Sequence, residues 1–240
     1  MSKKKVDIII PVYNEIKNLL ILFKLLKKNV KSDILILICF DSYKDDVFTN
    51  RNLLNKFKLK YKLIKNDKKG PCEAIKQGIK KSSSDCVIVY PADDFLNTKL
   101  IDQMIKKFNE GNEIVAPSRF MKGGSMKNCP ILKSILVRIC SFTLYFFSSI
   151  PIQDASNGFR LFSKKLLKKI KIESKVGFAY SLEILVKCER LNMKITQIPA
   201  RWEERKFGKS RFATFNWLKQ YLRWYFYGLS TTWLFKKNEN

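Results

Sequence analysis

The sequence predicts an α/β fold in which a mostly parallel sheet carries helices on both faces. In the first half of the chain, short apolar runs alternate with amphipathic stretches of helical period. The runs are apolar at successive positions, which is typical of strands buried on both faces. Polar residues follow such runs directly, as in 86-CVIVYPADD-94. Parallel sheets bind ligands at the carboxyl ends of their strands, so these polar residues mark the expected site.

The first half of the chain alternates strand and helix. The apolar runs predict strands over residues 6–11, 34–40, 61–64, 86–90 and 113–118. Helical spacing of apolar residues predicts the helices between them, which begin after Asn14, near Val47, at Pro71 and near Leu100. Asn14 is expected to cap the first helix, and Pro71 suits the first position of the third.

The second half of the chain departs from this alternation. An apolar, aromatic helix is predicted over residues 131–149, and 154-DASNGFRLF-162 follows as a turn. Further helices are expected near 163–170, 179–190 and 213–235, with a strand over 194–200. No linker or repeat interrupts the chain, so residues 1–212 are predicted to form one domain, with 213–240 as a C-terminal amphipathic helix.

The charge balance predicts a polyanionic partner. The chain has 47 Lys and Arg against 21 Asp and Glu, a formal net charge of +26. Nucleic acid, a membrane surface and phosphorylated substrates are the candidate partners of so basic a chain. The lysines are spread along the whole chain, as on an ordinary solvated surface, and no nucleic-acid recognition motif is present. Nucleic acid is therefore not expected as a partner.

The histidine and cysteine content excludes several kinds of catalytic or metal site. The chain has no histidine, which excludes an imidazole base or ligand. Six cysteines without a CxxC pair predict reduced thiols in a cytosolic compartment rather than a disulfide framework or a zinc site. No signal peptide is visible, and the longest strongly apolar charge-free stretch, residues 139–153, is shorter than the ~20 residues that a membrane span needs.

Three aspartates follow predicted strands: Asp41, Asp93 and Asp94. The glycine-rich loops that usually hold a nucleotide are missing, since 208-GKS-210 lacks the earlier glycine of a P-loop and has Glu203 there. Without such a backbone cradle, a nucleotide diphosphate needs a divalent cation, and Asp93 and Asp94 could hold one. The alternative is that the two adjacent aspartates close a turn or cap a helix.

An ordered set of motifs resembles family 2 glycosyltransferases. The motifs are 7-DIIIPVYNE-15, Asp41, 70-GPCEAIKQGI-79, 87-VIVYPADD-94, 115-VAPSRF-120, 154-DASNGFRLF-162 and 205-RKFGKSR-211. They are most similar to the branch that includes dolichol-phosphate mannose synthase and bacterial polyprenyl-phosphate glycosyltransferases, and the likeness spans residues 5–212. The resemblance implies an A-type glycosyltransferase fold, a nucleotide-sugar donor, and Mg²⁺ or Mn²⁺ as cofactor.

The resemblance also assigns the donor side of the site. It implies that the donor is bound by Pro11, Tyr13, Glu15, Asp41, Gly70, Ala92 and Asp93. Asp93 matches the last aspartate of the family's Asp-x-Asp metal motif, whereas Asp94 should point elsewhere by strand alternation. Pro91 replaces the first aspartate of that motif. This departure implies a thinner metal site, a changed donor preference, or a fold that has lost catalysis.

Scarce arginines mark the expected acceptor side. In the resembling family, the positions of Arg119, Arg160, Ser210 and Arg211 line the acceptor phosphate, and Asp93, Arg119 and Arg205 are the expected catalytic residues. Arginine suits this role because its planar fork binds phosphate through two nitrogens. The alternative is that some of these arginines form structural ion pairs, for example with Asp154 or Glu183. Asp154 could instead serve as a base if the acceptor is a hydroxyl.

Two functions follow from the resemblance. The first is inverting transfer of a sugar from a GDP- or UDP-sugar to a polyprenyl phosphate. The second is transfer to a glycan hydroxyl in cell-surface polysaccharide synthesis. The aromatic, basic helices at 131–149 and 213–235 suit a membrane interface, although they could also pack into the core. We expect a cytoplasmic protein held peripherally on the inner face of a membrane, and homo-oligomers are compatible with the sequence.

Overall fold

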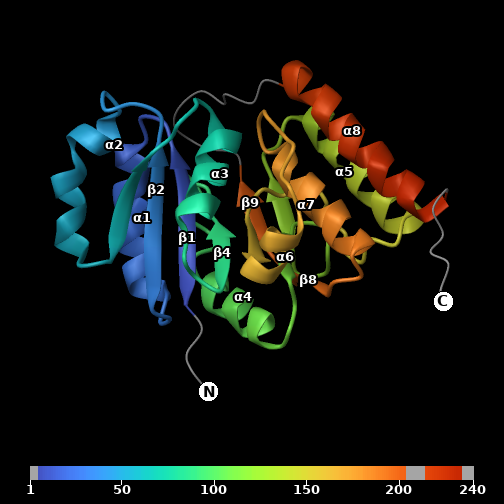
Figure 1. The fold of residues 1–240 in the computed structure, drawn as a ribbon, viewed down its shortest axis with the longest axis horizontal. Helices are drawn as coiled ribbons and strands as arrows, with labels where there is room; N and C mark the ends of the chain where they lie inside the picture. Colours follow the sequence, from blue (N-terminus) through green and yellow to red (C-terminus); the bar gives the residue numbers. More distant parts are fainter. Residues whose placement is uncertain (1–4, 204–213, 234–240) are drawn as a thin grey trace.

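The computed structural model describes residues 5–203 and 214–233. Its centre is a seven-stranded sheet in the order β3-β2-β1-β4-β7-β5-β8 (Figure 1). The strands are β1 (Val6–Val12), β2 (Ile34–Phe40), β3 (Tyr61–Lys65), β4 (Cys86–Val89), β5 (Ile114–Ser118), β7 (Arg160–Ser163) and β8 (Ile195–Pro199). Only β7 runs antiparallel to its neighbours, β4 and β5, within this sheet. The predicted mostly parallel sheet is therefore confirmed.

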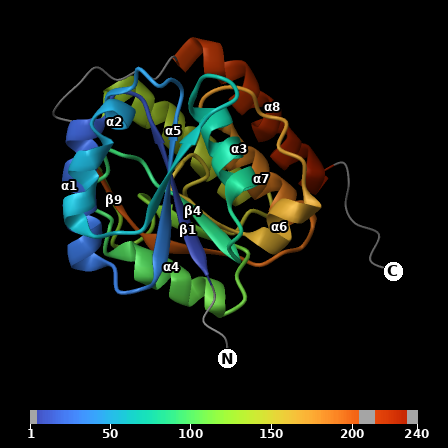
Figure 2. The same cartoon turned by 60° about the vertical axis from the view of Figure 1, so that its left-hand side comes forward.

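Helices cover both faces of the sheet. One face carries α1 (Ile16–Asn29), α2 (Asp46–Thr49), the 3₁₀ helix η1 (Arg51–Phe57) and α4 (Leu100–Asn109). The other carries α3 (Pro71–Lys81), α5 (Ile131–Phe147), α6 (Lys164–Lys169), α7 (Ala179–Arg190) and α8 (Thr214–Trp233). Figure 2 shows α1 and α3 on opposite sides of β1. The strand pattern explains these layers, because Ile8 and Ile10 enter one core and Ile9 enters the other.

Three local predictions are corrected. The stretch around Arg160 is not a turn, because this residue begins strand β7. A small second sheet pairs β6 (Ser125–Lys127) with β9 (Arg201–Glu203), and neither strand was predicted from the sequence. Asn14 does not cap α1 and has a left-handed φ of 53°. The backbone N–H of Ile16 instead donates to Asp46 Oδ1, 3.1 Å away. The cap is thus supplied from a distant loop, which no local pattern reveals.

Helix α8 packs against α7 and α5, and all three lie at one end of the molecule (Figure 1). The indole of Trp224 is buried, and its Nε1–H donates to Ser174 Oγ at 2.9 Å. Gly228 lies against Val186 and Leu144, where a larger side chain would have no room. The predicted alternative of core packing is therefore correct for one face of α8.

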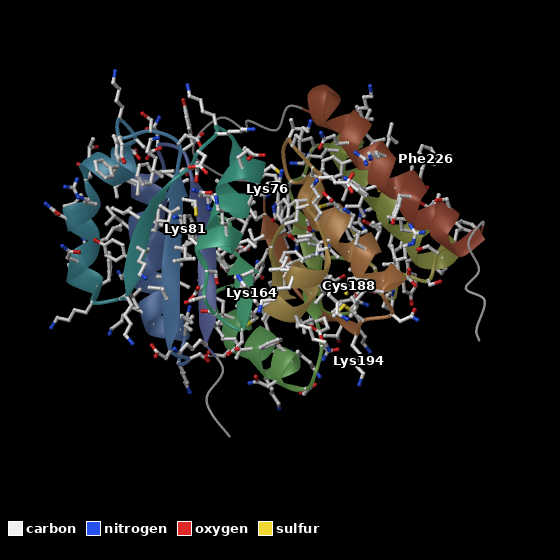
Figure 3. The ribbon with its side chains drawn as sticks, viewed as in Figure 1. Lys76, Lys81, Lys164, Cys188, Lys194 and Phe226 are labelled. Carbon is white, nitrogen blue, oxygen red and sulfur yellow. The ribbon has the colours of Figure 1, made fainter. Side chains whose placement is uncertain are left out.

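The opposite faces of α5 and α8 are apolar and exposed. We call this surface the exposed apolar face; its members are Ile131, Leu132, Ile135, Leu136, Ile139, Phe146, Phe147, Leu218, Leu222 and Phe226. Phe226 is labelled on α8 in Figure 3. Exposed apolar side chains grouped on two packed helices are typical of an interaction site. Within the described residues, neither α5 nor α8 nor any other helix is long and apolar enough to span a bilayer.

The cysteines behave as apolar packing residues. All six are free thiols, and four of them are buried. Burial raises the pKa of the Cys39 thiol to about 12, so this group stays protonated at neutral pH.

Gly78 sets the distance between α3 and the sheet. A Cβ at this position would lie 2.6 Å from Ile9 Cγ2 and 3.1 Å from Cys39 Sγ. We expect Gly78→Ala to lower the free energy of unfolding by about 1–3 kcal/mol through overpacking, although alanine is the better helix former. Gln77→Ala, on the same helix, is the control and should stay within about 1 kcal/mol. Urea denaturation measures both, and a stabilised Gly78→Ala variant would contradict the close packing.

Candidate active site

A pocket of about 240 Å³ lies at the carboxyl ends of β1 and β2. It is lined by Tyr13, Asn14, Asp41, Ser42, Lys44, Asp45 and Lys69. Two of the predicted donor-binding residues, Tyr13 and Asp41, are thus brought together here. Pro11 lies just before them on β1, paired with Cys39 of β2. The pocket has the position that parallel sheets use for ligands.

The Asp41 carboxylate is oriented by two donors from the loop after β3. Asn66 Nδ2 donates to its Oδ1 at 2.8 Å, and the Gly70 N–H donates to its Oδ2 at 3.1 Å. Gly70 has φ 104°, a conformation that glycine adopts without strain. The sequence analysis missed Asn66, although it follows β3 just as Asp41 follows β2. Applying the strand-end rule to every strand would have found it.

The Asp45 carboxylate and the Asn14 side-chain amide join the loops that frame this pocket. Asp45 Oδ2 accepts from the Asn14 N–H at 3.0 Å, and Asp45 Oδ1 accepts from the Val47 N–H at 2.9 Å. In return, Asn14 Oδ1 accepts from the Asp46 N–H at 3.1 Å. Glu15, the third predicted residue of this region, accepts a hydrogen bond from Asn18 within the first turn of α1. These bonds hold the loops around the pocket in place, and none of them involves the Asp41 carboxylate.

The two aspartates after β4 have different surroundings. Asp94 accepts from the Leu96 N–H at 3.0 Å and from Asn97 Nδ2 at 2.7 Å, so it closes a turn. Burial raises its pKa to about 6. Asp93 is partly exposed next to the buried Ala92. The turn interpretation therefore applies to Asp94 and leaves Asp93 as the candidate metal ligand.

Metal binding by Asp93 stays a prediction, with Pro91 in the place of a second carboxylate. The described residues contain no group of three or more His, Cys, Asp or Glu side chains that could enclose a metal ion. Mg²⁺, however, is commonly held by one or two carboxylates together with substrate phosphates and waters. One carboxylate at Asp93 beside a nucleoside diphosphate fits that pattern.

Asn97 ties this turn to the strand before residues 204–213. Its Oδ1 accepts from the Arg201 N–H at 3.1 Å, and its Nδ2 donates to the Arg201 carbonyl oxygen at 2.6 Å. The predicted residues Arg205, Ser210 and Arg211 lie outside the described residues, so their roles stay predictions. Asn97 was also missed, because its partner is 104 positions away in the chain.

Arg119 forms a buried ion pair with Asp154. Its Nε and Nη2 donate to the two carboxylate oxygens at 2.7 and 2.9 Å. The Arg119 side chain is 10% exposed and that of Asp154 is not exposed at all. Burial alone would raise the pKa of Asp154, but the charge and hydrogen bonds of Arg119 outweigh it and hold the pKa below its usual range. Asp154 is therefore ionised at neutral pH.

Arg160 lies beneath this pair and is fully buried. Its Nη2 donates to the Asp154 carbonyl oxygen and its Nη1 to the Ser181 carbonyl oxygen, both at 2.8 Å. Its Nε is buried without a partner among the described residues. A direct contact between Arg160 and an acceptor phosphate finds no support in this arrangement. The predicted alternative of a structural ion pair with Asp154 is confirmed for Arg119, while Arg160 bonds the backbone carbonyl of Asp154.

A chain of aromatic rings leads from the buried cluster of Arg119, Asp154 and Arg160 toward the exposed apolar face. The Arg119 guanidinium carbon lies 5.2 Å from the centre of the Phe120 ring, and that of Arg138 lies 4.8 Å from it. The Phe120 ring packs against Phe142 of α5 at a centroid distance of 5.8 Å, and the Phe142 ring lies 6.4 Å from that of Phe146, a member of the exposed apolar face. The buried charge and the exposed apolar face are thus connected through these aromatic side chains.

Comparison with known proteins decides the family. The sequence model described as Glycosyl transferase family 2 matches residues 7–171. The chain belongs to glycosyl transferase family 2. The predicted family is confirmed.

Sequence relatives lie within the predicted branch of family 2. A dolichol-phosphate mannosyltransferase of Pyrococcus furiosus is 27% identical over 230 residues, which cover 92% of this chain and 64% of the relative. A polyprenol monophosphomannose synthase of Mycolicibacterium smegmatis is 21% identical over 119 residues, which cover 48% of this chain and 44% of the relative. The chain thus matches less than two thirds of the length of either relative.

Solved structures of other proteins share the fold of this family 2 chain. Glucosyl-3-phosphoglycerate synthase from Mycobacterium tuberculosis in complex with UDP matches with a TM-score of 0.67 at 13% identity, covering 95% of this chain and 80% of that one. Its complex with Mn²⁺, UDP and glucosyl-3-phosphoglycerate matches with a TM-score of 0.66 at 12% identity, covering 92% and 78%. The predicted A-type glycosyltransferase fold is confirmed.

Breaking the buried ion pair from one side should destabilise the protein. We expect Asp154→Ala to lower the free energy of unfolding by about 3–5 kcal/mol, because Arg119 is left buried without its counterion. Asp33→Ala is the control: it breaks an exposed pair with Lys60 and should cost at most about 1 kcal/mol. Urea denaturation distinguishes them, and equal losses would contradict the buried ion pair.

The same ion pair should make the free energy of unfolding depend on pH in the acid range. Because the pKa of Asp154 is lower folded than unfolded, its contribution is complete above the unfolded value of about 3.9 and is lost as pH falls through the folded value. The stability gap between wild type and Asp154→Asn should be constant from about pH 5 upward and shrink below about pH 4. Unfolding curves across this range test it, and a gap that does not change with pH would refute it.

Proposed function

We propose that the chain transfers a sugar from a nucleotide-sugar donor to a polyprenyl phosphate at the cytoplasmic surface of a membrane. The observation that carries this proposal is the row of rings Phe120, Phe142 and Phe146, which runs from Arg119 to the exposed apolar face. A lipid phosphate has the matching character, since its anionic head can reach Arg119 while its chain follows apolar surface. The family and the names of the sequence relatives support the same acceptor class.

The chemistry of a phosphate acceptor also fits the buried carboxylate. A hydroxyl acceptor needs a base to remove its proton. Asp154, which the sequence offered as that base, already accepts two hydrogen bonds from the Arg119 guanidinium and is not exposed. A phosphate monoester has a second pKa of about 6 and is largely anionic at pH 7, so it needs no base.

The reaction is then a single inverting displacement. An oxygen of the acceptor phosphate attacks the anomeric carbon, the bond from that carbon to the diphosphate breaks, and the nucleoside diphosphate leaves with the electron pair. The pocket beside Tyr13 and Asp41 would bind the nucleoside, and Asp93 would hold Mg²⁺ or Mn²⁺ on the diphosphate. That cation would neutralise charge on the leaving group. Arg119 would bind the incoming phosphate and reduce the repulsion between the two anions.

The exposed apolar face would place the site against the lipid. Both helices also carry basic residues, Lys133 and Arg138 on α5 and Lys219 and Arg223 on α8, of which Arg223 forms an ion pair with Glu173. Each Lys or Arg close to an anionic lipid surface contributes on the order of 1 kcal/mol to binding. The combination of apolar and basic side chains is that of helices that lie in the membrane interface.

A transfer assay tests the reaction. Purified protein would receive a polyprenyl phosphate in detergent with radiolabelled GDP- and UDP-sugars, with Mn²⁺ or with EDTA. We expect metal-dependent label in the lipid and a loss of about 100-fold or more for Asp93→Asn, because a metal ion supplies several kcal/mol of charge stabilisation. Asp33→Asn, a carboxylate exposed on the surface, is the control. Label found only in released sugar or on a glycan hydroxyl would refute the lipid-phosphate acceptor.

Vesicle binding tests the membrane contact. We expect the double variant Leu222→Ser, Phe226→Ser to bind anionic vesicles at least about tenfold more weakly, because it removes two large side chains from the exposed apolar face. The matched control is Ile21→Ser, Leu53→Ser, which removes two equally exposed side chains from α1 and η1. Sedimentation with vesicles measures both, and equal binding by the two double variants would argue against this face.

A further inference from the structure

The Asp154 carboxylate is completely engaged inside the protein. Besides the two bonds from the Arg119 guanidinium, its Oδ2 accepts from the Arg119 N–H at 3.0 Å. Its Oδ1 also accepts from Ser156, from Oγ at 3.2 Å and from the N–H at 3.3 Å. The side chain has no exposed surface. A group enclosed in this way does not reach a proton on a bound acceptor.

The bonds to Asp154 and Ser156 fix one edge of the Arg119 guanidinium. Nε and Nη2 donate to the carboxylate, and Nη2 also donates to Ser156 Oγ at 2.7 Å. Among the described residues, Nη1 makes no hydrogen bond. A guanidinium is a planar group with donors in fixed directions, so clamping one edge determines where the remaining donors point.

We propose that Asp154 is a positioning residue: it clamps the Nε and Nη2 edge of Arg119 so that Nη1 faces the acceptor anion, and it takes no proton itself. This inference rests on the proposed function and adds a specific role within it. Arg160 supports the clamp from below, since its Nη2 holds the Asp154 backbone carbonyl at 2.8 Å.

The charges of the cluster agree with this role. One carboxylate, Asp154, lies between two guanidinium groups, Arg119 and Arg160, and the three side chains are almost entirely enclosed. The three side chains therefore carry a net charge of +1. Buried charges are normally paired, so an incoming anion at Arg119 would complete the set. Without the Asp154 carboxylate, Arg119 would keep its charge, but its Nη1 would no longer be oriented toward the acceptor anion.

A double-mutant cycle on transfer kinetics tests the clamp. The variants are Asp154→Asn, Arg119→Met and the two combined, assayed with polyprenyl phosphate and the donor found for wild type. If Asp154 acts through Arg119, Asp154→Asn raises the acceptor KM about tenfold or more and leaves the donor KM within about twofold. In the Arg119→Met background, the further loss from Asp154→Asn should be less than about twofold.

A second buried carboxylate provides the control for folding. Glu183 is also unexposed and pairs with Lys187 at 2.7 Å on α7. Glu183→Gln should destabilise the protein without raising the acceptor KM. A raised KM in Asp154→Asn would then not be explained by a general loss of stability. Binding of a nucleoside diphosphate with Mn²⁺, measured by calorimetry, confirms that each variant is folded at the donor side.

The outcomes separate the clamp from the function. Two results would overturn the clamp and keep the function, provided that sugar is transferred to the lipid phosphate. One is that the losses from Asp154→Asn and Arg119→Met are additive. The other is that Asp154→Asn removes an acid limb from the pH–rate profile. Transfer to a hydroxyl acceptor would overturn the function. The clamp would then survive only if the losses stay non-additive. No turnover of wild type with any donor would overturn both, because a residue cannot position a group for a reaction that does not occur.

Discussion

The ion pair between Arg119 and Asp154 joins parts of the chain that are far apart in sequence. Arg119 follows β5, Asp154 precedes β7, and Arg160 links the Asp154 backbone to Ser181 on α7. The sheet edge, the loop before β7 and helix α7 therefore share one set of charge-assisted bonds. Since a buried charge is costly without its partner, these elements must fold together for any of them to be stable. The chemistry of the acceptor side depends on this structural requirement.

The donor side is built on a different principle. Its pocket uses loop carboxylates and amides that hold one another in place, as Asp45 and Asn14 do, and it keeps Asp41 directed by Asn66 and Gly70. These bonds involve partly exposed loops rather than a buried ion pair. The Asn97 side chain bonds the backbone of Arg201 and so joins the turn after Asp93 to β9. The loop after β4 and the small second sheet are thus linked.

The fold was largely predictable because apolar runs and helical spacing are local signals. They located β1, β2, β4 and β5 closely, and with them the positions of Asp41 and Asp93. The prediction failed where the deciding partner is distant in the chain. Asp46 caps α1 from 30 positions away, and the arginine that pairs with Asp154 is Arg119, 35 positions before it. Arginine is mostly a surface residue, so no local pattern indicated that Arg160 would be buried.

Trp224 attaches α8 to the body of the protein through Ser174, and at Gly228 the helix lies close to Val186 and Leu144. If the bilayer covers Leu222 and Phe226, this attachment sets the position of the whole protein relative to the lipid surface. The height of Arg119 above the lipid surface is then set by the protein and not by the acceptor's chain. Selection would act on the phosphate head, and polyprenyl phosphates that differ only in the number of isoprene units would react at similar rates.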